Sequence, residues 1–196
     1  MRKKSHICLA YYLVNTVDNK MLREHKKAFV VGNVLPDCKV SFVTKRHNIT
    51  ETYDMVKDYI EKCSIKASSF EELKTAYCTR LGEIIHYIAD YFTFPHNANY
   101  DGSLSEHCIY EKYLKFELKK YVRTNNCKQF YPEKKIGSVQ ELFEFIEMKH
   151  NEYLLEKSTV ERDCMYIVAM CTIVVRTIID IVTKTVSNFT HLPVMA

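Results

Sequence analysis

The chain has 196 residues, of which 47% are hydrophobic, and this length suits one compact core but crowds out a second domain of ordinary size. The net charge is only +4, and the basic residues are interleaved with acidic ones, so the composition shows no basic footprint typical of a nucleic-acid-binding protein. We therefore expect a single domain over residues 1–196 and no nucleic-acid partner.

The first fifteen residues, MRKKSHICLAYYLVN, imitate a secretory signal through a basic start and a short apolar run. His6 interrupts the approach to that run, however, and no small-residue cleavage site follows it. The eight cysteines are also spread singly along the chain, which is typical of a reducing compartment. We expect a cytoplasmic protein that keeps His6.

Helices are predicted along most of the chain, because apolar residues recur at helical spacing and only four Gly and four Pro interrupt them. The clearest segments are residues 71–91, 105–122, 138–155 and 160–187. Hydroxyl residues followed by acidic ones at Ser69, Ser138 and Ser158 indicate helix starts. The pattern predicts an all-α, multi-helix bundle.

The longest apolar run, Cys164 to Val175, is followed by Arg176 and Asp180. We interpret it as a buried helix that is too short to cross a bilayer, and we expect no transmembrane segment. The densest basic stretch is Lys115, Lys119, Lys120, Arg123 and Lys128. It suits contact with anionic lipid or phosphate, although a solvated helix face is the more common explanation.

The most informative segment runs from residue 81 to 111, where histidines and carboxylates fall at metal-ligand spacings. His86 and Asp90 lie four residues apart on one helical face, as do His107 and Glu111 on the next helix. Between the pairs, Pro95 and the Asp101-Gly102 turn reverse the chain and should bring His96 close to both. Imidazole and carboxylate ligands without paired cysteines favour catalytic zinc, and we expect the metal cluster to lie between helices.

Further candidates lie upstream. Asp37 follows Pro36, His47 comes ten residues later, and His6 lies near the start. Asp37 in this position is also consistent with shaping a turn or capping a helix. The other histidines, His25, His150 and His191, are expected to be structural or solvated, and Glu83, Asp101 and Glu106 are expected to be solvated charges.

The order of these residues resembles the ligand order of the zinc-dependent phospholipase C family. The matching elements are His6, Pro36-Asp37, His47, His86 to Asp90, Pro95-His96, and His107 to Glu111. The motifs cover about the first 115 residues, and the single-strand-specific zinc nucleases have a similar fold and ligand set. The resemblance implies a single phospholipase C-like domain over residues 1–196.

The resemblance also implies how the ligands are grouped. One zinc would be held by Asp37, His47, His86 and Asp90, and a second by His96, His107 and Glu111. In the family, a third zinc takes the first histidine, here His6, together with the bridging aspartate and the amino-terminal nitrogen of a tryptophan. This chain has no tryptophan, and Met1 lies only five residues before His6. We therefore expect the amino terminus to fall short of a third ion, and two zincs to be held.

Paired zinc ions polarise phosphoryl oxygens and activate water for an in-line displacement, so a phosphodiester is the expected substrate. The resemblance implies a phospholipase C-like hydrolase that converts phospholipid to diacylglycerol and a phosphorylated head group. Asp37 and Glu111 are the two candidates for the general base. The alternatives are a non-catalytic or regulatory metal-binding helical protein, and a zinc nuclease or other phosphodiesterase. Peripheral contact with a membrane is compatible with the phospholipase C-like hydrolase.

Overall fold

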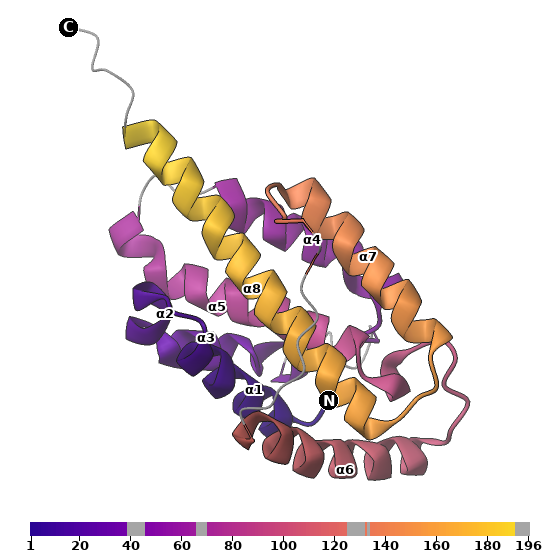
Figure 1. The fold of residues 1–196 in the computed structure, drawn as a ribbon. Coiled ribbons are helices and arrows are strands. Elements are labelled where there is room, and N and C mark those ends of the chain that lie inside the picture. Colours follow the sequence, from indigo (N-terminus) through magenta and orange to yellow (C-terminus); the bar gives the residue numbers. More distant parts are fainter. Residues whose placement is uncertain (39–45, 66–69, 125–131, 133, 191–196) are drawn as a thin grey trace, which may run out of the picture.

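A computed structural model describes residues 1–38, 46–65, 70–124, 132 and 134–190 (Figure 1). Its helices are α1 (Lys3–Thr16), α2 (Lys20–Glu24), α3 (Lys26–Gly32), α4 (Ile49–Ile65), α5 (Phe70–Tyr91), α6 (Leu104–Arg123), α7 (Val139–Leu155) and α8 (Val160–Thr190). Two short 3₁₀ helices, η1 (Leu35–Cys38) and η3 (Phe94–His96), join them. These ranges contain no strand, so the predicted all-α fold is confirmed, and the four predicted helices match α5 to α8.

The long helix α8 organises the bundle, because α4, α5, α6 and α7 all pack against it. In Figure 1, α8 runs diagonally across the molecule, with α7 along one side and α6 across its lower end. α5 is the other central helix, and every residue from 81 to 93 in and just beyond it is buried. Any polar side chain on this part of α5 must therefore find its partners inside the protein.

The apolar run near the carboxyl end is part of a longer apolar helix. The stretch Val160–Lys184 has 25 residues and is long and apolar enough to cross a membrane by length and composition. The prediction that it is too short was wrong, because the helix continues through Arg176 and Asp180. However, 78% of its most apolar window is buried inside the structure, which is the situation of a core helix. The predicted burial is confirmed.

The predicted helix starts are confirmed in part. Ser138 caps α7, and its side chain accepts a hydrogen bond from the backbone N–H of Glu141. At α8 the hydroxyl that accepts a backbone N–H, that of Arg162, belongs to Thr159 and not to Ser158. Ser69 lies outside the described residues. The sequence analysis did not predict the capping box of α6, in which the side chains of Ser103 and Glu106 each accept a hydrogen bond from the other residue's backbone N–H. The prediction that Glu106 is only a solvated charge was therefore wrong.

Two glycines allow α3 and α5 to touch backbone to backbone. A Cβ on Gly82 would collide with the carbonyl oxygen of Phe29, and a Cβ on Gly32 would collide with that of Thr79. The close approach matters for the site, since Gly32 is followed directly by Asn33 and then by η1. These segments are thereby held against the middle of α5.

We predict that Gly82→Ala lowers the free energy of unfolding by about 2 kcal/mol or more, because the added methyl group meets backbone that cannot move aside. Chemical denaturation measures the effect. Gly137→Ala is the matched control, since its Cβ would meet nothing closer than Glu141 Oε2 at 3.5 Å. Equal stability of the two variants would contradict the close helix crossing.

Candidate metal centre

The site is built on one face of α5, where His86 and Asp90 lie a helical turn apart. Both side chains are fully buried, and His86 Nε2 lies 3.3 Å from Asp90 Oδ2. Their i, i+4 spacing places them together, as predicted. A carboxylate at this depth is costly unless it is paired, so Asp90 requires cations or metal ions around it.

The segment before α4 and the turn after α3 bring two more donors to the same place. His47 Nδ1 lies 3.0 Å from His86 Nε2 and 3.2 Å from Asp90 Oδ2. Asp37, in η1, has its Oδ1 3.6 Å from His86 Nε2 and 3.8 Å from His47 Nδ1. The four residues that the resemblance grouped as one site therefore converge, although they come from three separate parts of the chain.

The amino-terminal segment reaches the same cluster. The ammonium group of Met1 donates a hydrogen bond of 2.6 Å to Asp90 Oδ1, and it lies 3.1 Å from Glu111 Oε1. His6, one turn into α1, stacks on His86 with ring centroids 3.9 Å apart, and its Nε2 lies 3.3 Å from Asp90 Oδ1. The prediction that the amino terminus falls short of this place was wrong. The backbone of Arg2, the N-cap residue of α1, is extended, so Met1 does not continue the helix.

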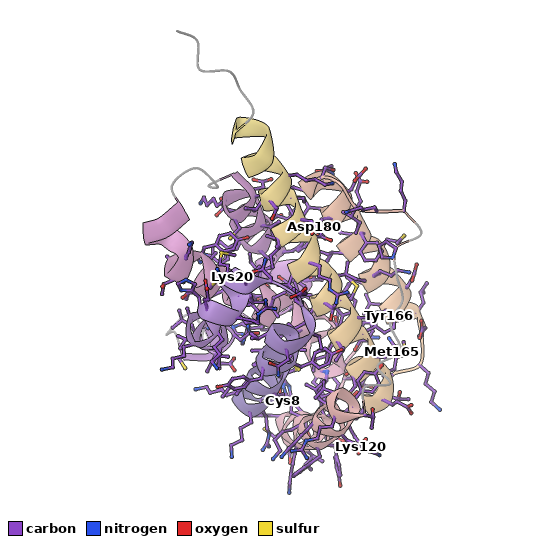
Figure 2. All side chains as sticks on the ribbon, turned by 60° about the vertical axis from the view of Figure 1, so that its left-hand side comes forward. Cys8, Lys20, Lys120, Met165, Tyr166 and Asp180 are labelled. Atoms are coloured by element: carbon purple, nitrogen blue, oxygen red, sulfur yellow. The ribbon has the colours of Figure 1, made fainter. Side chains whose placement is uncertain are left out.

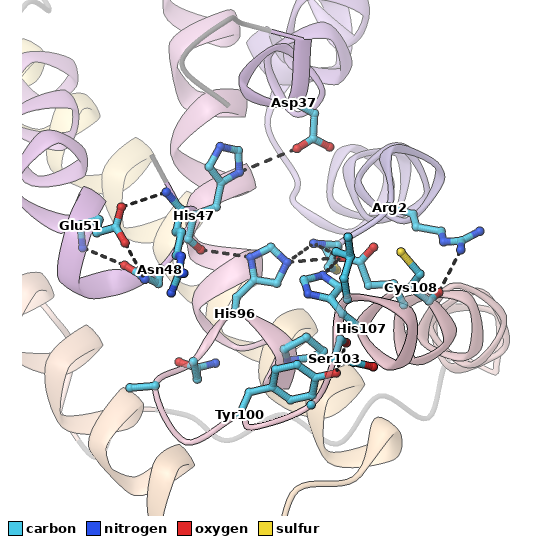
Figure 3. Close-up of a pocket in the computed structure, with 18 of the residues that line it drawn as sticks. Arg2, Asp37, His47, Asn48, Glu51, His96, Tyr100, Ser103, His107 and Cys108 are labelled. Atoms are coloured by element: carbon cyan, nitrogen blue, oxygen red, sulfur yellow. Dashed lines mark hydrogen bonds and ion pairs between the residues drawn. The ribbon is translucent and has the colours of Figure 1, made fainter. Parts of the chain in front are cut away.

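The second group lies between η3 and α6. His107 Nε2 and His96 Nε2 lie 3.1 Å and 3.3 Å from the same oxygen, Oε1 of Glu111. His107 and Glu111 are one turn apart on α6, while His96 comes from η3, so the predicted chain reversal is confirmed. Figure 3 shows the His96 ring between the His47 segment and His107.

Backbone carbonyl groups orient two of the histidines. His86 Nδ1 donates to the carbonyl of Asn33 at 2.9 Å, and His96 Nδ1 donates to the carbonyl of His47 at 3.2 Å. A histidine whose Nδ1–H is held in this way presents the lone pair of Nε2 to the site, which is the arrangement that metal ligation needs. The sequence gives no signal for these carbonyls, because any residue type supplies one.

Burial and charge set the protonation states of the cluster. Although burial alone would raise it, the pKa of Asp90 is held well below its usual range by His96, the Met1 ammonium, His86 and His6. Burial, aided by His86, lowers the pKa of His6 to about 3, so this ring is neutral. Burial also raises the pKa of Asp37. An anionic Asp90 beside neutral imidazole is a donor set for divalent cations.

The residues present fit zinc. Three groups have all their donor atoms within 4.8 Å of one another: His6, Asp37 and His86; His47, His86 and Asp90; and His96, His107 and Glu111. Nδ1 of His6 is buried without a hydrogen-bond partner among the described residues, and Nε2 has only the 3.3 Å approach to Asp90 Oδ1. A buried imidazole nitrogen without a partner raises the free energy of the folded state, and coordination of a metal ion would supply that partner.

Members of both groups line an open cavity of about 1070 Å³. They are Asp37 and His47 from the first group and His96, His107 and Glu111 from the second. Arg2, Lys3 and Arg46 add positive charge to its wall, while Tyr100 and Leu104 add apolar surface. The volume greatly exceeds that needed for metal ions, so it leaves room for a substrate of moderate size.

A buried carboxylate outside the cluster ties its supporting elements together. Asp163, on α8, accepts hydrogen bonds from the Phe94 N–H at 2.8 Å and the Tyr110 hydroxyl at 2.9 Å. It also accepts the hydroxyl of Tyr153 at 2.7 Å. Phe94 begins η3 and Tyr110 lies on α6, so Asp163 links the two elements that carry His96, His107 and Glu111. The sequence reading took the acidic residues here only as favourable at a helix start, and so missed this role.

The other histidines and acidic residues that the structure describes lie outside the cluster or serve the fold. His150 is structural, since it is buried and donates to Asn97 Oδ1 at 2.8 Å, and His25 lies 3.2 Å from Thr75 Oγ1 outside the cluster. His191 lies outside the described residues. Glu83 is buried rather than solvated, and Arg80 donates to it at 2.5 Å. Asp101 is exposed, as expected.

The comparison with protein families now gives the class of this chain. The family model described as zinc dependent phospholipase C matches residues 5–166. The chain therefore belongs to the zinc-dependent phospholipase C family, as its ligand order indicated. No curated protein and no solved structure matches it in the corresponding searches. The extent of the domain, residues 1–196, stays a prediction.

We predict that Asp163→Ala lowers the free energy of unfolding by about 3 kcal/mol or more, because it leaves the buried Tyr153 hydroxyl and two partly buried donors without their acceptor. Asp180→Ala is the control on the same helix, since Asp180 is exposed and forms an ion pair with Lys135 at 3.4 Å on the surface. Chemical denaturation should separate the two variants. Similar losses from both would contradict the linking role of Asp163.

We predict that His107→Ala lowers the zinc content by about one ion per chain, because it removes one of three donors from an open site. The side chain is partly exposed, so the fold should tolerate the change. Elemental analysis of protein prepared without chelator measures the ratio, with His25→Ala as the control. Zinc content equal to that of the unaltered protein would exclude His107 as a ligand.

Proposed function

We propose that this protein is a phospholipase C-like phosphodiester hydrolase that cleaves phospholipid to diacylglycerol and a phosphorylated head group. The observation that carries the proposal is the convergence of eight candidate ligands into neighbouring groups, some of which open into one cavity. The ligands are His6, Asp37, His47, His86, Asp90, His96, His107 and Glu111, and of these Asp37, His47, His96, His107 and Glu111 line the cavity. Family membership and the phospholipase ligand order support the same reaction.

The proposed ligand groups follow the geometry. Asp37, His47, His86 and Asp90 would hold one zinc, and His96, His107 and Glu111 a second. His6, the second oxygen of Asp90 and the Met1 amine form a place for a third. When bound, zinc would supply Lewis-acid stabilisation of the phosphoryl oxygens and activation of water.

Asp37 is the better candidate for the general base. Glu111 Oε1 is already approached by His96, His107 and the Met1 ammonium, all within 3.3 Å. The contacts of Asp37 are longer, and both involve Oδ1. Oδ2 would therefore accept the proton of the attacking water, while Glu111 would act as a ligand.

The cations on the cavity wall suit a phosphodiester. Arg2, Lys3 and Arg46 line the cavity together with the histidines, and they would attract and orient the anionic phosphate. Such charges raise the rate of encounter and favour an anionic substrate over a neutral ester. The apolar side of the cavity, with Leu104 and Tyr100, would receive the glycerol end of the lipid.

The substrate is a membrane component, so peripheral contact with a membrane surface is expected during catalysis. A cytoplasmic location is expected from the eight cysteines spread singly along the chain.

The test begins with elemental analysis, followed by an assay of phosphatidylcholine hydrolysis before and after removal and return of zinc. We expect His86→Ala and Asp90→Ala to lose bound zinc and to lower hydrolysis by at least about a thousandfold, because the metal supplies several kcal/mol of transition-state stabilisation. His25→Ala should retain both properties.

The outcomes separate the candidate functions. A protein that takes up no zinc would contradict the metal centre itself. Zinc binding without hydrolysis of any phosphodiester would contradict the enzyme and leave a metal-binding protein. Hydrolysis of single-stranded nucleic acid but not of phospholipid would favour the nuclease alternative.

A further inference from the structure

The outer face of α6 exposes large apolar side chains. Of the eight large hydrophobic residues that are exposed in the described part of the chain, four lie on this helix. They are Leu104, Ile109, Tyr113 and Phe116, with exposed fractions of 78%, 50%, 62% and 54%. Ile109, Tyr113 and Phe116 repeat at i, i+4 and i+7, so they form one stripe opposite the buried Leu114 and Leu118.

Positive charge surrounds this stripe. Lys112, Lys119, Lys120 and Arg123 are exposed on the same side of the helix. The ammonium group of Lys115 lies 4.0 Å from the centre of the Phe116 ring. We define the α6 outer face by its exposed members, which are Ile109, Lys112, Tyr113, Phe116, Lys119, Lys120 and Arg123. Lys128, the last member of the basic stretch seen in the sequence, lies outside the described residues.

Acidic residues interrupt this face very little. Glu117 is paired with Lys120 at 3.5 Å, and Glu106 is held in the capping box at the start of the helix. The neighbouring α1 packs against α6, and its N-cap residue Arg2 is followed by Lys3 and Lys4 at the start of the helix. Arg2 donates to the carbonyl of Cys108 at 2.9 Å, so positive charge continues from α6 to the start of α1.

The same helix also borders the cavity. Leu104, His107, Cys108 and Glu111, all on α6, line the cavity. In Figure 3, Arg2 and Cys108 lie together beside the His107 end of the site. In Figure 2, α6 forms the lower edge of the molecule, and Lys120 lies there among outward-pointing side chains. A surface that met this face would therefore lie next to the cavity.

The combination of groups determines the kind of surface. Lysines on their own are well hydrated in water, which is why the sequence favoured a solvated face. Half-exposed isoleucine, phenylalanine and tyrosine side chains on the same stripe are not well hydrated. A membrane interface accommodates both kinds of group. Lysine and arginine are attracted to anionic head groups, while aromatic and aliphatic side chains are buried at the boundary between head groups and acyl chains. The cytoplasmic leaflet is the anionic one.

We propose that the α6 outer face docks the protein on an anionic lipid bilayer and so presents the cavity to phospholipid in that bilayer. This inference rests on the proposed function, because it explains how a substrate held in a membrane reaches the metal centre. It adds the element, the residues and the lipid charge that the docking requires.

The first experiment is cosedimentation with phosphatidylcholine vesicles that either contain or lack phosphatidylserine. The Lys112→Glu, Lys119→Glu double variant should bind the anionic vesicles about 25-fold more weakly or worse, since each basic residue near such a surface contributes about a factor of five. Lys26→Glu, Lys27→Glu on α3 changes the net charge equally and should bind as the unaltered protein does.

The apolar part of the face needs its own variant. Phe116→Ser, Ile109→Ser should weaken vesicle binding at least tenfold at low and high salt alike, because burial of apolar surface is not screened by ions. Leu155→Ser is the control, since Leu155 is 89% exposed at the end of α7. Binding of the unaltered protein should itself fall as salt rises.

The test distinguishes failure of docking from failure of the proposed function. Hydrolysis of monomeric short-chain phosphatidylcholine should be the same in the α6 variants and the unaltered protein, whereas hydrolysis in anionic vesicles should fall with binding. Vesicle binding can be measured even if no hydrolysis is found. Equal binding of the α6 and α3 charge variants would overturn the proposal. The proposal would also be overturned if the α6 variants differed from the unaltered protein only in self-association, because the face would then be a contact between two copies of the chain.

Discussion

The burial of one carboxylate governs the arrangement of this protein. Asp90 lies on the central helix α5, fully enclosed, and it can be accommodated there only if positive or metal-ligating groups surround it. The chain supplies them from every side: the Met1 amine, His6 of α1, His47 before α4, and His86 on α5 itself. The bundle is therefore organised around its polar centre as well as around its apolar core.

The elements near this centre are held by contacts that do not touch the proposed ions. The glycine crossing of α3 and α5 brings Asn33 within reach of His86, and Asp163 joins η3 to α6. Such supports matter for a metal site because ligand positions must hold to within a fraction of an ångström. They also explain why acidic and glycine residues occur in helices that otherwise serve the core.

The inner and outer sides of α6 connect the metal centre to its proposed surroundings. His107 and Glu111 face inward to the cavity, while Ile109, Tyr113 and Phe116 face outward among lysines. A helix has room for both roles, because residues of opposite faces alternate along it. If the outer face meets a lipid bilayer, the same rigid element carries the ligands and sets their position relative to the substrate.

The sequence by itself determined the helices α5 to α8 and the pairs His86–Asp90 and His107–Glu111, because both follow from local periodicity that neighbouring residues impose. It also indicated the family, through the order of the ligands. Only the tertiary structure decided that the Met1 amine reaches Asp90, that Asp163 joins η3 to α6, and that the basic stretch of α6 carries exposed aromatic residues beside the cavity. These features depend on the packing of segments far apart in the chain, on which local spacing has no bearing.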